Sequence, residues 1–178
     1  MNVKVKRLRP NAALPVYGSA NAAGADLTAC LEENLIIRPG ETALVPTGLA
    51  LAIPEGTAGF VYARSGLALR QDLAPANKVG VIDADYRGEV MVAVHNHGRE
   101  TRVIEPGERI AQLVIAPVIR AGFDEGELDD TARGAGGFGS TGSKESGEWE
   151  GQSEWRGKAL CLFFGVSERA SRLTAMQF

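Results

Sequence analysis

The sequence predicts an all-β domain of the jelly-roll or β-barrel-like kind with one short helix. Its 178 residues include 22 glycines and 8 prolines, and its apolar residues fall in many short runs separated by turn-forming residues. Turns such as RPGE at 38–41 and PEG at 54–56 lie between apolar runs of strand length. Runs of this length and spacing indicate a β-meander or a jelly roll, and no repeat of fixed period is present.

Strands are expected along most of the first 117 residues. In residues 3–8, VKVKRL, apolar residues nearly alternate with basic ones, which predicts an opening edge strand with a charged outer face. One helix is expected over residues 63–70, with Ser65 as its N-cap. Further apolar runs predict strands over residues 35–37, 42–46, 48–53, 57–63, 79–82, 90–94 and 107–117.

Residues 80–90, GVIDADYRGEV, predict the turn of a β-hairpin that carries two carboxylates and a tyrosine. Apolar residues lead into and out of it, whereas Asp-Ala-Asp is poor in strand propensity and rich in turn propensity. A carboxylate at the end of a buried strand is held rigidly, which suits Asp83 to the role of a general base. A solvated acidic turn explains the same residues, and this stretch alone leaves both interpretations open.

Other polar residues are candidates for ligand binding. Arg64 lies beside Ser65 at the N-terminus of the expected helix, where unpaired N–H groups attract anions, although an ordinary capped surface helix fits the pattern equally well. Asn77 offers the donor and the acceptor needed to read the edge of a pyrimidine base, or is a plain loop residue. Gln112 lies in an apolar run and needs a partner. Asp26, taken alone, is interpreted as a turn or cap acid.

Composition argues against several classes of partner. The formal net charge of −3 and the pI of about 5.5 provide no global field to hold DNA or RNA. Cys30 and Cys161 form no C-x-x-C pair, which favours a reducing compartment. His95 and His97 lack a third ligand at a fitting spacing and are interpreted as surface residues. With no secretion signal and no apolar run of membrane-spanning length, the sequence predicts a soluble, cytoplasmic protein that binds neither a nucleic-acid polymer nor a membrane.

The C-terminal quarter divides into two expected segments after a β domain over residues 1–132. Residues 133–142, RGAGGFGSTG, contain too many glycines to hold a fixed fold unaided and suit a mobile lid that closes over a phosphorylated, planar ligand. They lack the preceding strand that a dinucleotide-binding or P-loop motif requires. Residues 143–178 form an unexplained extension, expected to be flexible.

Five segments, AGADLTA, ARSGLA, NKVGVIDADYRG, GERIAQL and RGAGGFGSTG, resemble in order and spacing the five motifs of the trimeric dUTPase family. The resemblance implies a jelly-roll homotrimer with three active sites at subunit interfaces, each completed by the C-terminal arm of a neighbouring chain. It implies the reaction of dUTP with water to give dUMP and pyrophosphate, with magnesium. Such an activity limits uracil incorporation into DNA and supplies dUMP for dTTP synthesis.

The resemblance gives roles to the two acidic positions. Asp83 resembles the base that orients and deprotonates the water attacking the α-phosphorus. Asp26 resembles the acid that holds magnesium through its water shell while triphosphate oxygens coordinate the ion directly. This division suits magnesium, which dehydrates reluctantly.

The resemblance also implies which residues bind the nucleotide. Tyr86 is expected to pack under the sugar and leave no room for a 2′-hydroxyl, and Arg133 to reach the γ-phosphate. The other implied phosphate contacts are Arg64, Ser65, Gly66, Gln112, Ser140 and Thr141. The implied uracil contacts are Asn77, the backbone of Val81, Ile82 and Met91, and Phe138 stacking on the base, with Gly139 in the same arm.

The sequence argues against three alternative functions. A dCTP deaminase resembles this fold but uses a catalytic glutamate on the strand after the tyrosine position, and Ala93 stands there in this chain. A bifunctional enzyme is disfavoured for the same reason. A binding or signalling module that has lost catalysis is disfavoured by the presence of Asp26, Asp83 and Arg133.

Overall fold

Two antiparallel sheets and a two-stranded ribbon build the domain, in the computed structural model that describes residues 1–137. The strands are β1 (Lys4–Arg7), β2 (Val16–Tyr17), β3 (Ala25–Thr28), β4 (Leu35–Ile37), β5 (Thr42–Ala52), β6 (Thr57–Tyr62), β7 (Leu73–Pro75), β8 (Gly80–Ile82), β9 (Glu89–Asn96), β10 (Arg102–Ile104) and β11 (Arg109–Pro117). The helix α1 spans Ser65–Gln71. Met1–Phe123 form one compact unit, and the described part of a second unit begins at Asp124.

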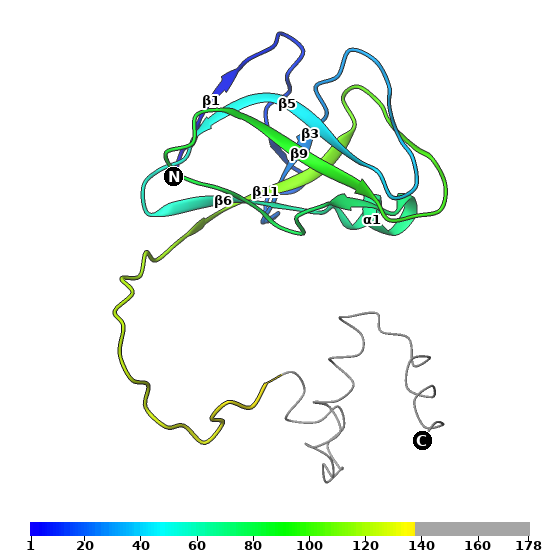
Figure 1. The fold of residues 1–178 in the computed structure, drawn as a ribbon. Coiled ribbons are helices and arrows are strands. Elements are labelled where there is room, and N and C mark those ends of the chain that lie inside the picture. Colours follow the sequence, from blue (N-terminus) through cyan, green and yellow to red (C-terminus); the bar gives the residue numbers. More distant parts are fainter. Residues whose placement is uncertain (138–178) are drawn as a thin grey trace, which may run out of the picture. The chain divides into compact units, whose positions relative to one another are not determined.

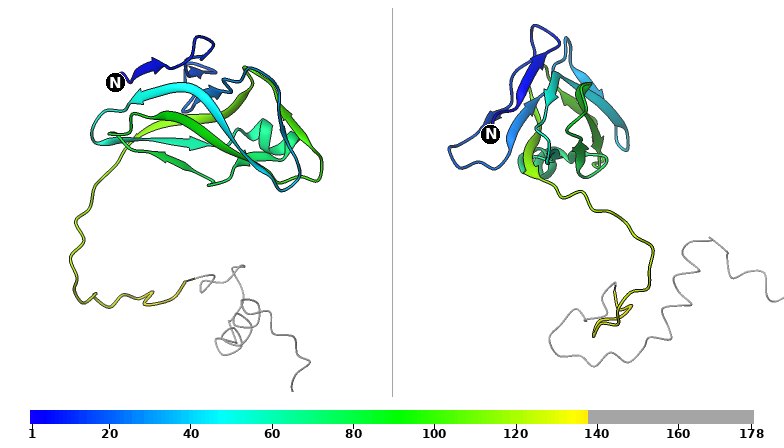
Figure 2. Two further views of the ribbon diagram at one scale, coloured as in Figure 1. Left: turned by 45° about the horizontal axis from the view of Figure 1, so that its top comes forward. Right: turned by 90° about the vertical axis from the view of Figure 1, so that its left-hand side faces the viewer.

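The sheets confirm the all-β jelly-roll prediction and exclude a meander. One sheet has the strand order β1-β5-β9-β7 and the other the order β2-β3-β11-β6-β8, while β10 pairs with β4. Strands that follow each other in sequence therefore lie mostly in different sheets. In Figure 1, β5 and β9 run side by side in one layer and β6 and β11 in the other, and Figure 2 shows the same layers from two further directions.

The main apolar core joins residues of both sheets, and a smaller buried cluster forms around Leu49. Where a strand turns one face to the core, its side chains alternate between inward and outward positions. On β9, for example, Val90, Val92 and Val94 are buried whereas Met91 is exposed. Leu27 of β3 and Ile110 of β11 supply the facing layer of the same cluster. The predicted edge strand at the N-terminus is also confirmed, because β1 lies at the edge of its sheet and, among residues 1–137, pairs only with β5.

The predicted hairpin at residues 80–90 is wrong. β8 pairs with β6, whereas β9 pairs with β5 and β7, so the two strands belong to different sheets. Residues 83–88 are therefore a connection between the sheets. Apolar runs on both sides of an acidic turn fit a hairpin and a sheet-to-sheet crossover equally well, because side-chain alternation does not specify the partner strand.

The two strands predicted over residues 42–46 and 48–53 form one long strand, β5, with an irregularity between Pro46 and Ala50. Gly48 lies in this irregularity with φ +71°, and a Cβ there would lie 2.7 Å from both the Ala12 Cβ and the Cys30 Sγ. Glycine is the residue that tolerates both the left-handed backbone and the close approach.

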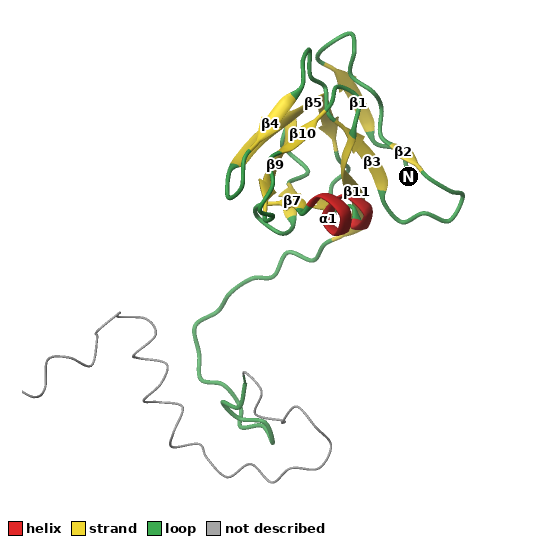
Figure 3. Cartoon of the chain, turned by 90° about the vertical axis from the view of Figure 1, so that its right-hand side faces the viewer, coloured by secondary structure: helices red, strands yellow, loops and turns green. Residues whose placement is uncertain are grey.

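The predicted helix is confirmed, but the predicted N-cap, Ser65, is wrong. Arg64 is the N-cap, with extended backbone (φ −90°, ψ 128°) and no side-chain capping bond, and Ser65 is the first helical residue. The helix ends at Asp72, which adopts the left-handed conformation. Figure 3 shows α1 beside β7, and Leu67 is its buried residue.

Residues 124–137 contain no strand or helix. A turn spans residues 132–135, in which the Gly134 N–H donates to the Thr131 carbonyl at 3.0 Å and the Gly136 N–H to the Arg133 carbonyl at 3.0 Å. The predictions for Phe138, Gly139, Ser140 and Thr141, and for residues 143–178, lie outside the described residues. Among residues 1–137, no helix is long and apolar enough to cross a membrane.

Candidate active site

A pocket of about 360 Å³ lies beside β8 and the first half of β9. We call it the β8–β9 pocket. Its lining includes all of the residues expected to bind uracil and the sugar within the described chain, together with the predicted base. The lining residues are Leu44, Val61, Asn77, Gly80, Val81, Ile82, Asp83, Tyr86, Glu89, Val90, Met91, Val92 and Ala93.

The turn between β7 and β8 places Asn77 at this pocket. Lys78 adopts a positive φ of 65°, and the Val79 N–H donates to the Asn77 carbonyl at 2.7 Å, which folds the chain back into β8. A Cβ on Gly80 would lie 3.4 Å from the Asn77 Nδ2 and 3.2 Å from the Val61 Cβ. The small residue at position 80 thus leaves room for the amide beside the strand.

Asp83 follows β8 directly, and its carboxylate is exposed. The Tyr86 N–H donates to the Asp83 carbonyl at 3.2 Å, and the Arg87 guanidinium donates to the carbonyls of Ala84 (2.6 Å) and Tyr86 (2.8 Å). These bonds close the connection into a compact turn. A strand does precede Asp83, as predicted, but the prediction that this strand is buried is wrong, because β8 is only partly buried.

Tyr86 stands at the rim of the same pocket with 46% of its surface exposed. Its hydroxyl donates to the Glu89 carbonyl at 2.9 Å. The Glu89 carboxylate in turn accepts from the Gly48 N–H at 2.8 Å and from the Arg9 guanidinium at 3.2 Å. The rim is therefore connected to the irregularity of β5 and to the N-terminal segment.

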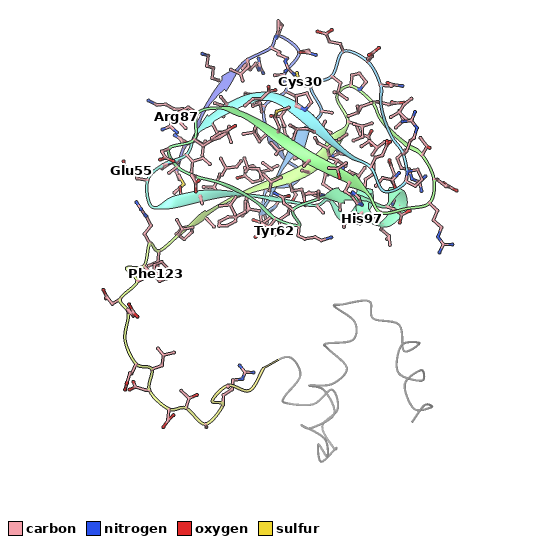
Figure 4. The ribbon with its side chains drawn as sticks, viewed as in Figure 1. Cys30, Glu55, Tyr62, Arg87, His97 and Phe123 are labelled. Atoms are coloured by element: carbon pink, nitrogen blue, oxygen red, sulfur yellow. The ribbon has the colours of Figure 1, made fainter. Side chains whose placement is uncertain are left out.

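A second hollow of about 670 Å³ shares Asp83 with the β8–β9 pocket. Glu55, Asp85, Arg87 and Arg120 contribute its charged side chains. In Figure 4, Glu55 and Arg87 are labelled at the same end of the domain. Asp83 thus lies where two hollows meet, which leaves its carboxylate accessible from both.

Asp26 forms the centre of a second group, which we call the Asp26 cluster: Asp26, Arg64, Arg109 and Gln112. Arg64 Nε donates to Asp26 Oδ1 at 2.9 Å, Arg109 Nη1 to Oδ2 at 3.1 Å, and Gln112 Nε2 to Oδ1 at 3.3 Å. Asp26 is only 7% exposed and lies inside β3. The interpretation as a turn or cap acid is therefore wrong, since two cations and an amide stabilise a buried carboxylate here.

Arg109 is the functional candidate that sequence reasoning missed. Arg109 and Gln112 are three residues apart, so a regular strand would direct their side chains to opposite faces. A register shift between Arg109 and Ala111 removes this alternation, and both side chains reach Asp26. The motif GERIAQL contains both polar residues, but nothing in its periodicity predicts the shift.

The remaining predicted residues are distributed as follows. Ser65 and Gly66 open α1 next to Arg64, and a Cβ on Gly66 would meet no atom within 4 Å. Arg133 lies in the described part of the second unit. Within Met1–Phe123, the β8–β9 pocket brings together Asn77, Asp83 and Tyr86, and its lining does not include Asp26, Arg64 or Gln112.

No group of three or more His, Cys, Asp or Glu side chains in the described residues is arranged to hold a metal ion. Asp26 is a single carboxylate whose two oxygens already accept from three donors. An ion bound near it would take most of its ligands from water or from a phosphorylated substrate. This donor set fits magnesium, which keeps several waters and binds by one or two carboxylates plus phosphate oxygens.

Comparisons with known proteins agree on one family. The family model described as dUTPase matches residues 10–142. The deoxyuridine 5′-triphosphate nucleotidohydrolase of Syntrophotalea carbinolica is 54% identical over 143 residues, which cover 80% of this chain and 97% of that protein. The protein of the same name from Hahella chejuensis is 50% identical over 141 residues, covering 78% and 93% respectively.

Solved structures lead to the same family. A mutant dUTPase of Staphylococcus bacteriophage 80alpha with dUpNHpp has a TM-score of 0.73 and 29% identity, covering 79% of this chain and 98% of that one. A mutant dUTPase of phage phi11, described with a structural Mg(II) ion, has a TM-score of 0.66 and 26% identity, covering 72% and 98%. With its jelly-roll fold and a family match across residues 10–142, the chain belongs to the dUTPase family.

Proposed function

We propose that this chain hydrolyses dUTP, the nucleotide in its relatives' name, and that the products are dUMP and pyrophosphate. The observation that carries the proposal is the β8–β9 pocket, which gathers an amide, a carboxylate and a tyrosine. Asn77 offers the donor and acceptor that a uracil edge requires. Tyr86 offers a ring for the sugar, and Asp83 offers a carboxylate for a reacting water.

In the proposed reaction, Asp83 accepts a proton from a water molecule as that water attacks the α-phosphorus. The new bond joins the water oxygen to the α-phosphorus, and the bond from that phosphorus to the α,β-bridging oxygen breaks. Pyrophosphate leaves with the bonding electron pair. A positioned base is well suited to this step, because phosphoryl transfer depends mainly on orientation and charge stabilisation.

The Asp26 cluster is the proposed site for the phosphates. Arg64 donates through Nε to Asp26 and through Nη1 to the Arg109 carbonyl, so the bonds found among the described residues leave Nη2 for a phosphate oxygen. Magnesium, when bound, would neutralise charge on the triphosphate. Asp26 would hold the ion through water, because the three donors leave about one of the four acceptor sites of the carboxylate for a metal-bound water.

Sheet register supports active sites that combine residues of two chains. Asp26 pairs with Gln112, which pairs with Tyr62, and Ile82 pairs with Gly59. Asp83, the residue after β8, is therefore offset from Asp26 by three strand spacings of about 4.8 Å across the sheet and by about four residues of about 3.3 Å along the strands. Because these two offsets are perpendicular, the straight-line separation of the two backbone positions is roughly 20 Å. A water attacking the α-phosphorus lies within roughly 3.5 Å of it, so a separation of this size favours a site whose two acids come from different chains.

We therefore propose a homotrimer in which Asp83 of one chain faces the Asp26 cluster of another, with residues 133–142 of a neighbouring chain as the closing arm. The direct test of the activity is phosphorus NMR of the products formed with magnesium from dUTP, dCTP, dTTP and UTP. Pyrophosphate from dUTP alone supports the proposal. Release of inorganic phosphate, or equal cleavage of all four nucleotides, contradicts it.

A further inference from the structure

Gly88, two residues after Tyr86, occupies the space next to the Tyr86 ring. A Cβ at position 88 would lie 2.6 Å from Tyr86 Cζ and 3.0 Å from Cε2, and it would also collide with the phenol oxygen. Real Cβ atoms essentially never approach this closely. The ring therefore occupies its observed position only while residue 88 lacks a side chain.

Backbone conformation does not explain this glycine. The glycines with positive φ among the described residues are Gly40, Gly48, Gly56, Gly107 and Gly134, and Gly88 is not one of them. An alanine at 88 is therefore compatible with the backbone. What it would change is the space available to the Tyr86 ring.

A second contact holds the ring on the side of Glu89. The Tyr86 hydroxyl donates to the Glu89 carbonyl, and the Glu89 carboxylate accepts from Gly48 and Arg9. With 46% of Tyr86 exposed, few packing contacts oppose an outward rotation of the ring. A side chain at position 88 should therefore displace the Tyr86 ring from the pocket rim and should lower the free energy of unfolding only slightly.

We propose that Gly88 is a positioning residue that fixes the Tyr86 ring at the rim of the β8–β9 pocket and thereby sets the preference for deoxyribose over ribose. The inference rests on the proposed function, in which the ring packs under the sugar. Gly88 contacts no reacting atom in this account. It acts through Tyr86 alone, which makes its effect separable from a loss of folding.

The test is Gly88→Ala, compared with the full-length wild-type chain for hydrolysis of dUTP and UTP. We expect the ratio of kcat/KM for dUTP to kcat/KM for UTP to fall by about tenfold or more, the range that steric discrimination of one small group supplies. The melting temperature should stay close to that of the wild type. In a Tyr86→Ala background, Gly88→Ala should produce no further fall in the ratio, because its only target is gone.

Nitration of tyrosine by tetranitromethane, followed by peptide mass spectrometry, reports the ring position without any catalysis. Tyr86 should be nitrated faster in Gly88→Ala, whereas Tyr17 and Tyr62, which are 55% and 41% exposed, should keep their rates. Gly18→Ala is the matched control, since a Cβ there meets no atom within 4 Å and its φ is not positive. It should change neither readout.

An unchanged Tyr86 nitration rate in Gly88→Ala would overturn the inference, and so would an unchanged dUTP-to-UTP ratio despite faster nitration. A further fall in the ratio in the Tyr86→Ala background would also overturn it. Failure of the wild-type chain to hydrolyse dUTP would instead count against the proposed function, and the nitration rates would still decide whether Gly88 positions the ring.

Discussion

At the scale of single residues, Asp26 and Asp83 show how differently one chain can treat two carboxylates. Asp26 is buried in β3 and receives hydrogen bonds from Arg64, Arg109 and Gln112, whereas Asp83 is exposed at the junction of two hollows. A carboxylate enclosed by hydrogen-bond donors is suited to holding cationic groups at fixed positions. A carboxylate open to water is suited to accepting a proton from it.

We expect Asp83→Asn to fold and to bind nucleotide but to lower kcat for dUTP by at least about 10²-fold, the usual scale for losing a positioned base. The amide keeps the size of the side chain and removes the basic oxygen. Steady-state kinetics and calorimetric titration with a non-hydrolysable dUTP analogue measure the two quantities. Near-normal kcat in the variant would remove Asp83 from the mechanism.

The two arginines of the Asp26 cluster should differ in their contribution to stability. Arg64 is 23% exposed and bonds at 2.9 Å, whereas Arg109 is 58% exposed. Removing the better-buried partner leaves a buried charge poorly compensated, so Arg64→Gln should cost about 2 kcal/mol of unfolding free energy. Solvent screening limits the cost of Arg109→Gln to less than about 1 kcal/mol.

Urea unfolding of both arginine variants and of the wild type at one protein concentration measures this difference. An equal loss in the two variants, or a larger loss for Arg109→Gln, would show that exposure does not rank the two ion pairs. Retained stability in both would show that Gln112 alone compensates Asp26.

At the scale of elements, the sequence predicted which segments are strands better than it predicted their partners. Alternating valines identify β9, and turn residues at 38–41 and 54–56 mark the ends of strands. The pairing of β8 with β6 rather than β9 depends on contacts between distant parts of the chain, which no local pattern encodes. The shift near Arg109 and the irregularity at Gly48 are departures from regular alternation, so periodicity could not reveal them.

The candidate site shows the same contrast between features that a local sequence pattern predicts and features that depend on distant contacts. Residues clustered in one segment, such as Asp83 and Tyr86, were found from the sequence and from the family resemblance, and they do line one pocket. The burial of Asp26 and the contribution of Arg109 depend on β3 and β11 lying side by side. Such contacts between strands distant in sequence appear only in the folded chain.

Gly48 provides a test of the irregularity in β5. Gly48→Ala combines a positive φ with close contacts to Ala12 and Cys30, whereas Gly40→Ala has a positive φ of 75° in open space. The left-handed backbone alone costs about 1–2 kcal/mol for a residue with a Cβ, and overpacking adds roughly 1–3 kcal/mol. Gly48→Ala should therefore lower the free energy of unfolding more than Gly40→Ala does. Equal losses in denaturant unfolding would show that β5 shifts freely at this point.

At the scale of the whole molecule, each proposed active site combines residues of more than one chain. The β8–β9 pocket and the Asp26 cluster each hold part of the proposed machinery, and the register separates the backbone positions of Asp26 and Asp83 by roughly 20 Å. Assembly would join Asp83 of one chain to Asp26 of another. The arm at residues 133–142 would then close the site from a neighbouring subunit.

Two truncations test the expected boundaries of the chain. Ending the chain after Lys144 removes only the extension and should leave dUTP hydrolysis and the melting temperature unchanged. Ending it after Ala132 also removes Arg133 and the rest of the arm, so stability should change little while hydrolysis falls severely, because phosphate positioning and water exclusion are lost together. If loss of residues 145–178 alone unfolds the protein or abolishes turnover, the expected domain boundary is wrong.

The most direct measurement of the composite site mixes two inactive variants, Asp26→Asn and Asp83→Asn, by joint unfolding and refolding. If Asp26 and Asp83 of one site come from different chains, random assortment in a cyclic trimer gives about one site in four with both wild-type carboxylates. We predict that dUTP hydrolysis, negligible for each variant refolded alone, reappears in the mixture. Mixed trimers that remain inactive would contradict the account, because they would place both acids of each site in the same chain.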